Sequence, residues 1–230
     1  MARPWEIIDE APVPGGDGTL YLMARGSEYR IRVDDRDLMS NREHGSEAGL
    51  ADLACDRLER LDDARILVGG LGMGFTLAAT LRRLGSSGSV TVAEISPAVV
   101  RWNRDHVAAA AKYPLRDPRV VVRVGDVGDL VENPPAPWSA ILLDVDNGPR
   151  SLTRAYNGWL YSRQGLAAAY AALIPGGVLG IWSAKPDARF TRRLHQTGFD
   201  VEVLPFTEEG RATDDHSGTH ILWMVRRPYR

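Results

Sequence analysis

The sequence has few cysteines and no long apolar runs, the features typical of disulfide-rich and membrane-spanning proteins. It has one cysteine, Cys55, in 230 residues, which excludes a scaffold built on disulfides within the chain. No apolar run approaches the roughly 20 residues that a membrane-spanning helix needs, so we expect no membrane partner. The first residues also lack an apolar signal segment. We therefore expect a cytoplasmic protein.

Lysine is scarce as well, because only Lys112 and Lys185 among the 28 basic residues are lysines. Thirty acidic residues offset the arginines and leave a net charge of -2. The chain thus lacks the net basic field of nucleic-acid-binding domains, and we expect no nucleic-acid partner. Charge is uneven, since residues 1–60 carry eight arginines and thirteen acids. An acidic front favours a cationic small-molecule ligand.

The acidic front predicts a small β structure. Strands are expected at 5–8, 19–25 and 29–33, because glycine-rich turns separate these runs and polar and apolar residues alternate over 29–33. Ser46 is the predicted N-cap of a helix in which leucines recur at helical spacing. We therefore assign residues 1–45 to an N-terminal β-hairpin segment.

The remainder, residues 46–230, alternates apolar strands with helices and predicts one α/β domain with a parallel sheet covered on both faces. The motif Pro175-Gly176-Gly177 is expected to close one of these helices. The expected strands are 65–68, 89–93, 120–124, 140–143, 178–182, 201–204 and 220–225, and the expected helices are 75–84, 97–111, 164–173 and 190–196.

A glycine-rich turn joins the strand at 65–68 to the helix at 75–84. Gly69, Gly70, Gly72 and Gly74 permit a tight turn and a close approach of the backbone to a ligand. The helix that follows offers free N–H groups at its first turn. Such turns also occur for packing alone.

Acidic side chains follow the next three strands and sharpen this interpretation. Glu94 can accept hydrogen bonds from both ribose hydroxyls, and Asp126 can accept an adenine amino hydrogen. Asp144 and Asp146 follow the fourth strand and could bind a cationic ligand or act in acid–base catalysis. They could also cap the loop that follows. Together these residues predict a nucleoside pocket at the carboxyl edge of the sheet.

The order of these motifs resembles the spermidine synthase (polyamine aminopropyltransferase) family, within the class of S-adenosylmethionine-dependent methyltransferase folds. The resemblance implies a Rossmann-like methyltransferase fold with a small N-terminal β segment, and a transferase of polyamine biosynthesis. The residues that carry it are Gly69–Gly74, Glu94 with Ser96-Pro97, Gly125-Asp126, Asp144 with Asp146-Asn147-Gly148-Pro149, Leu160-Tyr161-Ser162 and Leu173–Leu179.

The resemblance implies a role for each matching residue. An amine acceptor and decarboxylated S-adenosylmethionine, or S-adenosylmethionine itself, would be the substrates, with no metal and with a homodimer as the suggested assembly. Asp144 would be the general base or the electrostatic partner of the attacking amine. The donor would contact Gly69, Gly70, Leu71, Gly72, Gly74, Glu94, Ile95, Asp126, Val127 and Asp144, and the acceptor would contact His44, Glu47, Asp146 and Tyr156.

The sequence departs from this family inside the glycine turn. Leu71 and Met73 stand where the family has an acidic residue that reaches the free amine of the donor. The second carboxylate after the fourth strand is also displaced, to Asp146. Two alternatives therefore stay open: a methyltransferase that uses S-adenosylmethionine on a small molecule, and a nucleoside-binding protein without catalysis.

Overall fold

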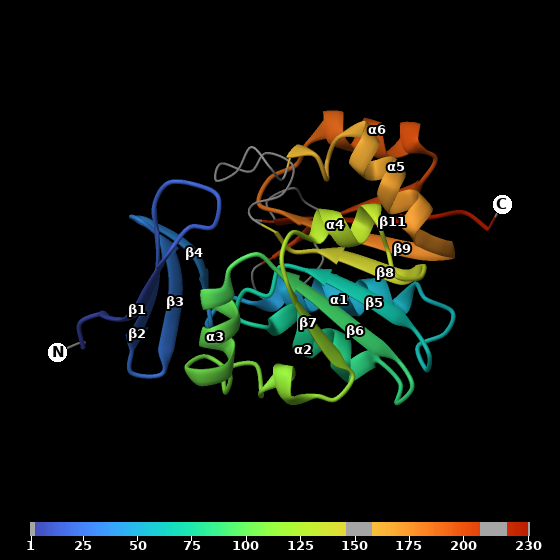
Figure 1. Cartoon of the computed structure of the whole chain (residues 1–230). Helices are drawn as coiled ribbons and strands as arrows, with labels where there is room; N and C mark the ends of the chain where they lie inside the picture. The colour runs from blue at the N-terminus through green and yellow to red at the C-terminus, as the bar shows by residue number, and fades with distance from the viewer. Residues whose placement is uncertain (1–2, 146–157, 208–219, 230) are drawn as a thin grey trace.

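The computed structural model describes residues 3–145, 158–207 and 220–229. Its N-terminal part is a four-stranded antiparallel sheet with the strands in chain order, which lies at one side of a larger sheet (Figure 1). The small sheet is formed by β1 (Glu6–Pro12), β2 (Thr19–Arg25), β3 (Glu28–Val33) and β4 (Arg36–Ser40).

The larger sheet has seven strands in the order β10-β11-β9-β8-β5-β6-β7. The pairs from β9 to β7 are parallel, whereas β11 is antiparallel to both of its neighbours. The chain runs outward from β5 through β6 to β7 and then returns to β8 on the other side of β5. The carboxyl ends of β5 and β8 therefore form a topological switch point, where open α/β sheets bind ligands. The strands are β5 (Arg65–Gly69), β6 (Ser89–Glu94), β7 (Val120–Val124), β8 (Trp138–Leu143), β9 (Leu173–Ser183), β10 (Asp200–Phe206) and β11 (His220–Arg226).

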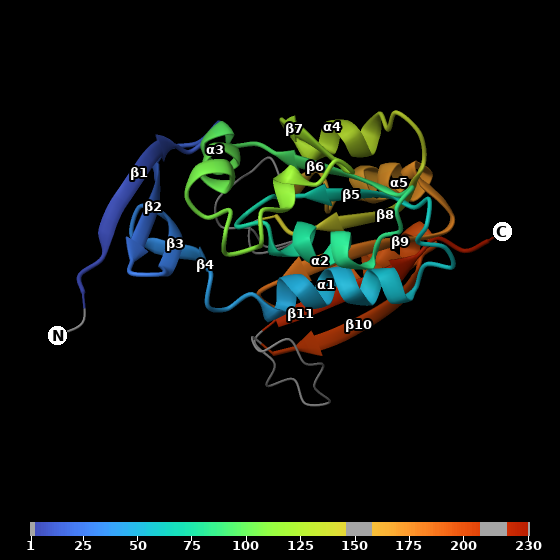
Figure 2. The same ribbon diagram turned by 90° about the horizontal axis from the view of Figure 1, so that it is seen from below.

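Helices cover both faces of the larger sheet, and each face has its own apolar core. The core that includes Leu50, Leu77 and Trp102 lies under α1, α2 and α3, and it continues into the small sheet through Leu22. The other core lies under α4, α5 and α6. In Figure 2, α1 and α2 lie against the sheet in the middle of the view, with β10 and β11 below α1, and α4 lies near the top. The helices are α1 (Gly45–Asp56), α2 (Phe75–Arg83), α3 (Pro97–Asp105), α4 (Val127–Glu132), α5 (Arg163–Ala172) and α6 (Ala188–Thr197), with a short 3-10 helix at Pro114–Arg116.

The structure corrects the sequence prediction at the junction between the small sheet and α1. The strand β4 was not predicted, because its polar residues Arg36 and Asp37 are exposed and show no alternation. Helix α1 has His44, not Ser46, at its N-cap, and no side chain caps it. Ser46 is instead buried inside the helix, where its hydroxyl donates to Glu47 at 2.8 Å. The N-cap prediction for Ser46 is therefore wrong.

Two predicted helix ends also differ. Helix α3 ends at Asp105, well before residue 111, because the N–H groups of His106 and Val107 both donate to the carbonyl of Trp102 and close a turn. Helix α5 passes directly into β9, so residues 175–177 lie inside a strand and do not form a turn that closes the helix. Pairing with the chain after β11 explains this, since the N–H of Gly176 donates to the carbonyl of Arg227 at 2.8 Å.

Candidate functional site

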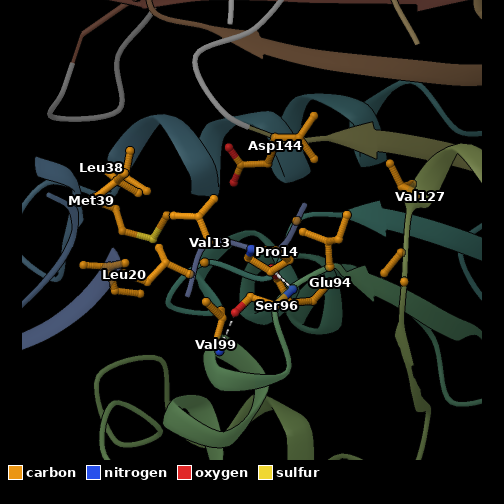
Figure 3. Close-up of a pocket in the computed structure, with 18 residues that line it drawn as sticks. Val13, Pro14, Leu20, Leu38, Met39, Glu94, Ser96, Val99, Val127 and Asp144 are labelled. Atoms are coloured by element: carbon orange, nitrogen blue, oxygen red, sulfur yellow. Dashed lines mark hydrogen bonds between the residues drawn. The ribbon is translucent and has the colours of Figure 1, made fainter. Parts of the chain in front are cut away.

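A cavity lies between the small sheet and the carboxyl ends of β5, β6 and β8 (Figure 3). Leu20, Leu38 and Met39 of the small sheet lie on one side in Figure 3, and Asp144 and Glu94 lie across from them. Both sheets therefore line this cavity. This first cavity is lined by Val13, Pro14, Leu20, Ile31, Val33, Leu38, Met39, Gly70, Gly72, Ala93, Glu94, Ile95, Ser96, Val99, Gly125, Val127, Asp144 and Val145.

The glycine turn after β5 packs tightly against the end of β8. Gly70 has φ +88, and a Cβ atom at this position would overlap the carbonyl oxygen of Asp144. The N–H of Gly70 donates to the carbonyl of Ala93 at 2.9 Å, which also ties the turn to β6. Glycine alone satisfies both the left-handed backbone and the close approach.

Glu94, at the end of β6, is held rigidly in the first cavity. It is 8% exposed, Oε2 accepts from the N–H of Leu71 at 2.9 Å, and Oε1 accepts from the N–H of Ser96 at 2.8 Å. The geometry suits a carboxylate that receives hydroxyl groups from a ribose.

Asp144 follows β8 and faces the first turn of α2. Its N–H donates to the carbonyl of Gly69 at 2.9 Å, and its Oδ2 accepts from Oγ1 of the buried Thr76 at 2.6 Å. Asp144 is thus oriented by both its backbone and its side chain.

A second cavity adjoins the first and shares Asp144 with it. Glu47, in the first turn of α1, lines this second cavity, and Ser46 donates to its carboxylate. Burial raises the pKa of Glu47, while the hydrogen bonds to its carboxylate from Ser46 and from its own backbone N–H act in the opposite direction. The second cavity is lined by Leu38, Met39, Ser40, Glu47, Leu71, Gly72, Met73, Phe75, Asp144 and Trp182.

Comparisons with known proteins agree with this architecture. No family model matches the chain. Polyamine aminopropyltransferases of Mycobacterium tuberculosis and Mycobacterium bovis are 33% identical over 129 residues, which is 54% of this chain and 24% of each relative. The match thus spans about a quarter of the length of these curated relatives.

Solved structures match over nearly the whole chain. Spermidine synthase from Thermotoga maritima superposes with a TM-score of 0.75 at 16% identity, covering 97% of this chain and 74% of that one. A spermidine synthase in complex with the transition-state analogue AdoDATO gives a TM-score of 0.74 at 16% identity, with coverage of 97% and 73%.

The chain has the fold of the spermidine synthases.

The expected Rossmann-like methyltransferase fold is confirmed by this likeness and by the seven-stranded sheet. The small sheet matches the expected N-terminal β segment in position, whereas the division into two domains at residues 45 and 46 stays a prediction.

The predicted donor-site residues divide between those that line a cavity and those that support it. Gly69 and Gly74 line neither cavity, and Gly74 occupies the N-cap of α2. Asp126 also lines neither, because it caps α4 by accepting the N–H of Gly128 at 2.7 Å. The predicted residues that line a cavity are Gly70, Leu71, Gly72, Glu94, Ile95, Val127 and Asp144.

The predicted acceptor residues are only partly brought together. Glu47 lines the second cavity beside Asp144. His44 lines neither cavity, and its ring instead stacks on Phe75 with the ring centres 3.9 Å apart. Asp146 and Tyr156 lie outside the described residues.

Several residues of the site were missed from the sequence, among them Thr76, which lines neither cavity but holds Asp144. Thr76 carried a usable signal, because a hydroxyl in the first turn of α2 directly follows the glycine turn. Trp182 lies near the carboxyl end of β9, which is the same edge of the sheet as the predicted acids. Val13 and Met39 carried none, since they reach the site only through the placement of the small sheet.

Within the described parts of the chain, no group of three or more His, Cys, Asp or Glu residues is placed to hold a metal ion. No helix described there is long and apolar enough to cross a membrane.

Proposed function

We propose that the chain transfers an aminopropyl group from decarboxylated S-adenosylmethionine to an amine acceptor. The observation that carries this proposal is the pair of adjoining cavities that share Asp144. Among their described lining residues, the charged side chains are Glu47, Glu94 and Asp144, all of them acidic. Both reactants would be cations, a sulfonium and an ammonium, and an acidic site attracts both.

The first cavity suits the adenosyl part of the donor. Glu94 would bind the ribose hydroxyls, while Gly125 and Val127 lie where the adenine would extend. The predicted contact of Asp126 with the adenine amino group stays a prediction, because its Oδ1 already caps α4. The glycine turn would then direct the sulfonium toward Asp144.

The acidic lining of the two cavities favours the decarboxylated donor. In the glycine turn, the N–H groups of Gly70, Leu71 and Gly74 are donated within the protein, to Ala93, Glu94 and Leu71 respectively. The described lining residues include no basic side chain. A donor that keeps its carboxylate would therefore place a negative charge beside Asp144 with little to balance it.

The reaction requires a neutral amine beside the donor. The nitrogen lone pair attacks the carbon next to the sulfonium, the C–S bond breaks, and its electron pair returns to sulfur to release methylthioadenosine. The nitrogen gives up one proton. A carboxylate in the shared wall attracts the ammonium and aligns it for attack, and such alignment contributes much of a rate enhancement.

Calorimetry tests the choice of donor. We expect decarboxylated S-adenosylmethionine and methylthioadenosine to bind, and S-adenosylmethionine to bind at least about tenfold more weakly, which is about 1.4 kcal/mol. Tight binding of S-adenosylmethionine with transfer of a methyl group would identify a methyltransferase. If no adenosyl compound bound, the proposal would be wrong for both enzymes.

A further inference from the structure

We infer that the acceptor is a primary amine with an apolar alkyl body, and that Leu38 and Met39 select it. The inference rests on the proposed function and names the class of acceptor for the same site. The ammonium group would face Asp144, and the alkyl body would lie against the small sheet. Three features support it: an apolar wall, a β-bulge that aims two of its side chains, and the place of these two between the cavities.

The small sheet and its β1–β2 turn present an uncharged wall to the site. Of the eight residues that they contribute to the two cavities, seven are apolar, and Ser40 is the exception. In Figure 3, Leu20, Leu38 and Met39 lie across the first cavity from Asp144. An alkyl group placed against this wall would be removed from water, which is favourable for apolar surface.

The charged residues of the small sheet pair with one another outside the cavities. Arg30 and Arg32 flank the buried Ile31 along β3, and both form ion pairs with Asp37 of β4, at 2.6 and 2.7 Å. None of these three charged residues lines either cavity. The acidic composition of this segment is therefore not what a ligand meets in the site.

A β-bulge aims Leu38 and Met39 at the site together. In a regular strand, neighbouring side chains point to opposite faces. Here Met39 pairs with Ile31 and Asp37 pairs with Arg32, which leaves Leu38 without a partner in β3. Bulges of this kind re-aim side chains and are frequent beside active sites. As a result, Leu38 and Met39 each line both cavities.

Leu38 and Met39 lie where the two cavities join. The described residues that line both cavities are Leu38, Met39, Gly72 and Asp144. Met39 also packs on the glycine turn, since a Cβ atom added at Gly72 would lie 3.0 Å from its Sδ. An amine whose nitrogen faces Asp144 therefore has Leu38 and Met39 beside its carbon chain.

Glu47 is the one acid of residues 3–60 that lines a cavity. Ser46 donates to its carboxylate at 2.8 Å, and Phe75 and Trp182 share the second cavity with it. A diamine would have to bring its second ammonium to this single acid among apolar and aromatic side chains. Burial of an ammonium without a full set of partners is costly, whereas burial of a methylene is favourable. The described walls therefore favour a monoamine over a diamine of the same length.

Calorimetry with two series of amines tests the inference. The first runs from propylamine to hexylamine, and the second consists of the α,ω-diamines of the same lengths. We expect the Kd of the monoamines to fall about fourfold for each added methylene, which is the affinity that burial of one methylene contributes. Hexylamine should bind at least about tenfold more tightly than 1,6-diaminohexane, whose second ammonium loses water. A Kd that does not change with chain length, or tighter binding of the diamine, would overturn the inference.

Two variants of Leu38 test the residue that the bulge aims at the site. Leu38→Ala should reduce the dependence of Kd on chain length. Leu38→Asp should remove it and make 1,6-diaminohexane bind more tightly than hexylamine, because the new acid offers the second ammonium a partner. A loss of stability alone would not reverse the order of two ligands. If both variants kept the wild-type dependence and order, the assignment of Leu38 would be wrong.

Met23→Asp is the matched control. Met23 is a half-buried residue of β2 that lines neither cavity, so the variant adds the same charge to the same sheet away from the site. It should keep the wild-type order of the amines. A reversal in Met23→Asp equal to that in Leu38→Asp would show that only the net charge of the sheet matters, and would overturn the inference.

Binding and transfer distinguish this inference from the proposed function. If the amines bind in the expected order but hexylamine and decarboxylated S-adenosylmethionine release no methylthioadenosine, the proposed function is wrong and the class of amine that the site binds stands. If methylthioadenosine is released faster with the diamines than with the monoamines, the proposed function stands and this inference is wrong.

Discussion

Thr76 and Asp144 are joined by a hydrogen bond of 2.6 Å from Oγ1 to Oδ2, across the junction of α2 and β8. Thr76 is buried, and this bond fixes the direction of the carboxylate. Asp144 lies in the wall of both cavities. The bond therefore aligns the one acid that would face both donor and acceptor.

Replacing Thr76 with valine tests this alignment. A valine keeps the shape of threonine and removes the hydroxyl that Asp144 accepts. Hydrogen bonds to charged groups contribute about 1.5–3 kcal/mol, so we expect transfer to slow by roughly 10- to 100-fold. Steady-state kinetics with the decarboxylated donor measures this.

Thr80→Val is the control for the Thr76 variant. Thr80 is also buried in α2, but its Oγ1 donates at 2.8 Å to the carbonyl of Thr76 within the helix. We expect Thr80→Val to keep wild-type turnover. Equal losses in both variants would mean that Thr76 acts only through the stability of α2.

Gly70→Ala should abolish donor binding. An alanine there is strained by the positive φ, at about 1–2 kcal/mol, and its Cβ also overlaps the Asp144 carbonyl oxygen. Gly26→Ala shares the first cost but not the second, because Gly26 has φ +64 and no atom within 4 Å of an added Cβ. Calorimetry with methylthioadenosine should show binding only in Gly26→Ala, and retained binding in Gly70→Ala would contradict the described packing.

Glu94→Gln should weaken donor binding. The amide would turn an NH₂ group toward one of the N–H donors of Leu71 and Ser96, and the charge would be lost. We expect the Kd for methylthioadenosine to rise roughly 10- to 100-fold, since bonds to charged groups contribute about 1.5–3 kcal/mol. Asp126→Asn, which keeps a competent N-cap for α4, should have a smaller effect. The reverse order would assign the main contact to Asp126.

Asp9 makes the attachment of the small sheet sensitive to pH. Its Oδ2 accepts from Arg101 at 2.6 Å and from Trp102 at 2.7 Å, and these bonds lower its pKa from 3.8 to about 2. A lowered pKa contributes stability that is full above the unfolded value and is lost as pH falls toward the folded value. Urea unfolding should show Asp9→Asn less stable than the wild type at pH 7, with the difference shrinking between pH 3.8 and about 2. A difference that persisted unchanged to pH 2 would refute this role.

The ligand-facing turns of the larger sheet could be predicted because local chemistry encodes them. A strand, a glycine turn and a helix follow one another in the sequence around Gly70, and Glu94 and Asp144 each follow an apolar strand. Parallel strands bring their carboxyl ends to one edge, so these residues come together without further information.

The walls that the small sheet contributes could not be predicted in the same way. Met39 faces the site because β4 pairs with β3 and the sheet docks beside α3, and neither contact leaves a periodic signal in the sequence. His44 illustrates the same limit. A histidine could contact the acceptor amine, but the ring of His44 stacks on Phe75 and lines neither cavity.

The most direct test of the account is to identify the group that the protein transfers. The protein would be incubated with a panel of primary amines and either decarboxylated S-adenosylmethionine or S-adenosylmethionine, and the products would be identified by mass spectrometry. We predict methylthioadenosine and an aminopropylated amine from the decarboxylated donor alone. S-adenosylhomocysteine and a methylated product from S-adenosylmethionine would contradict the account.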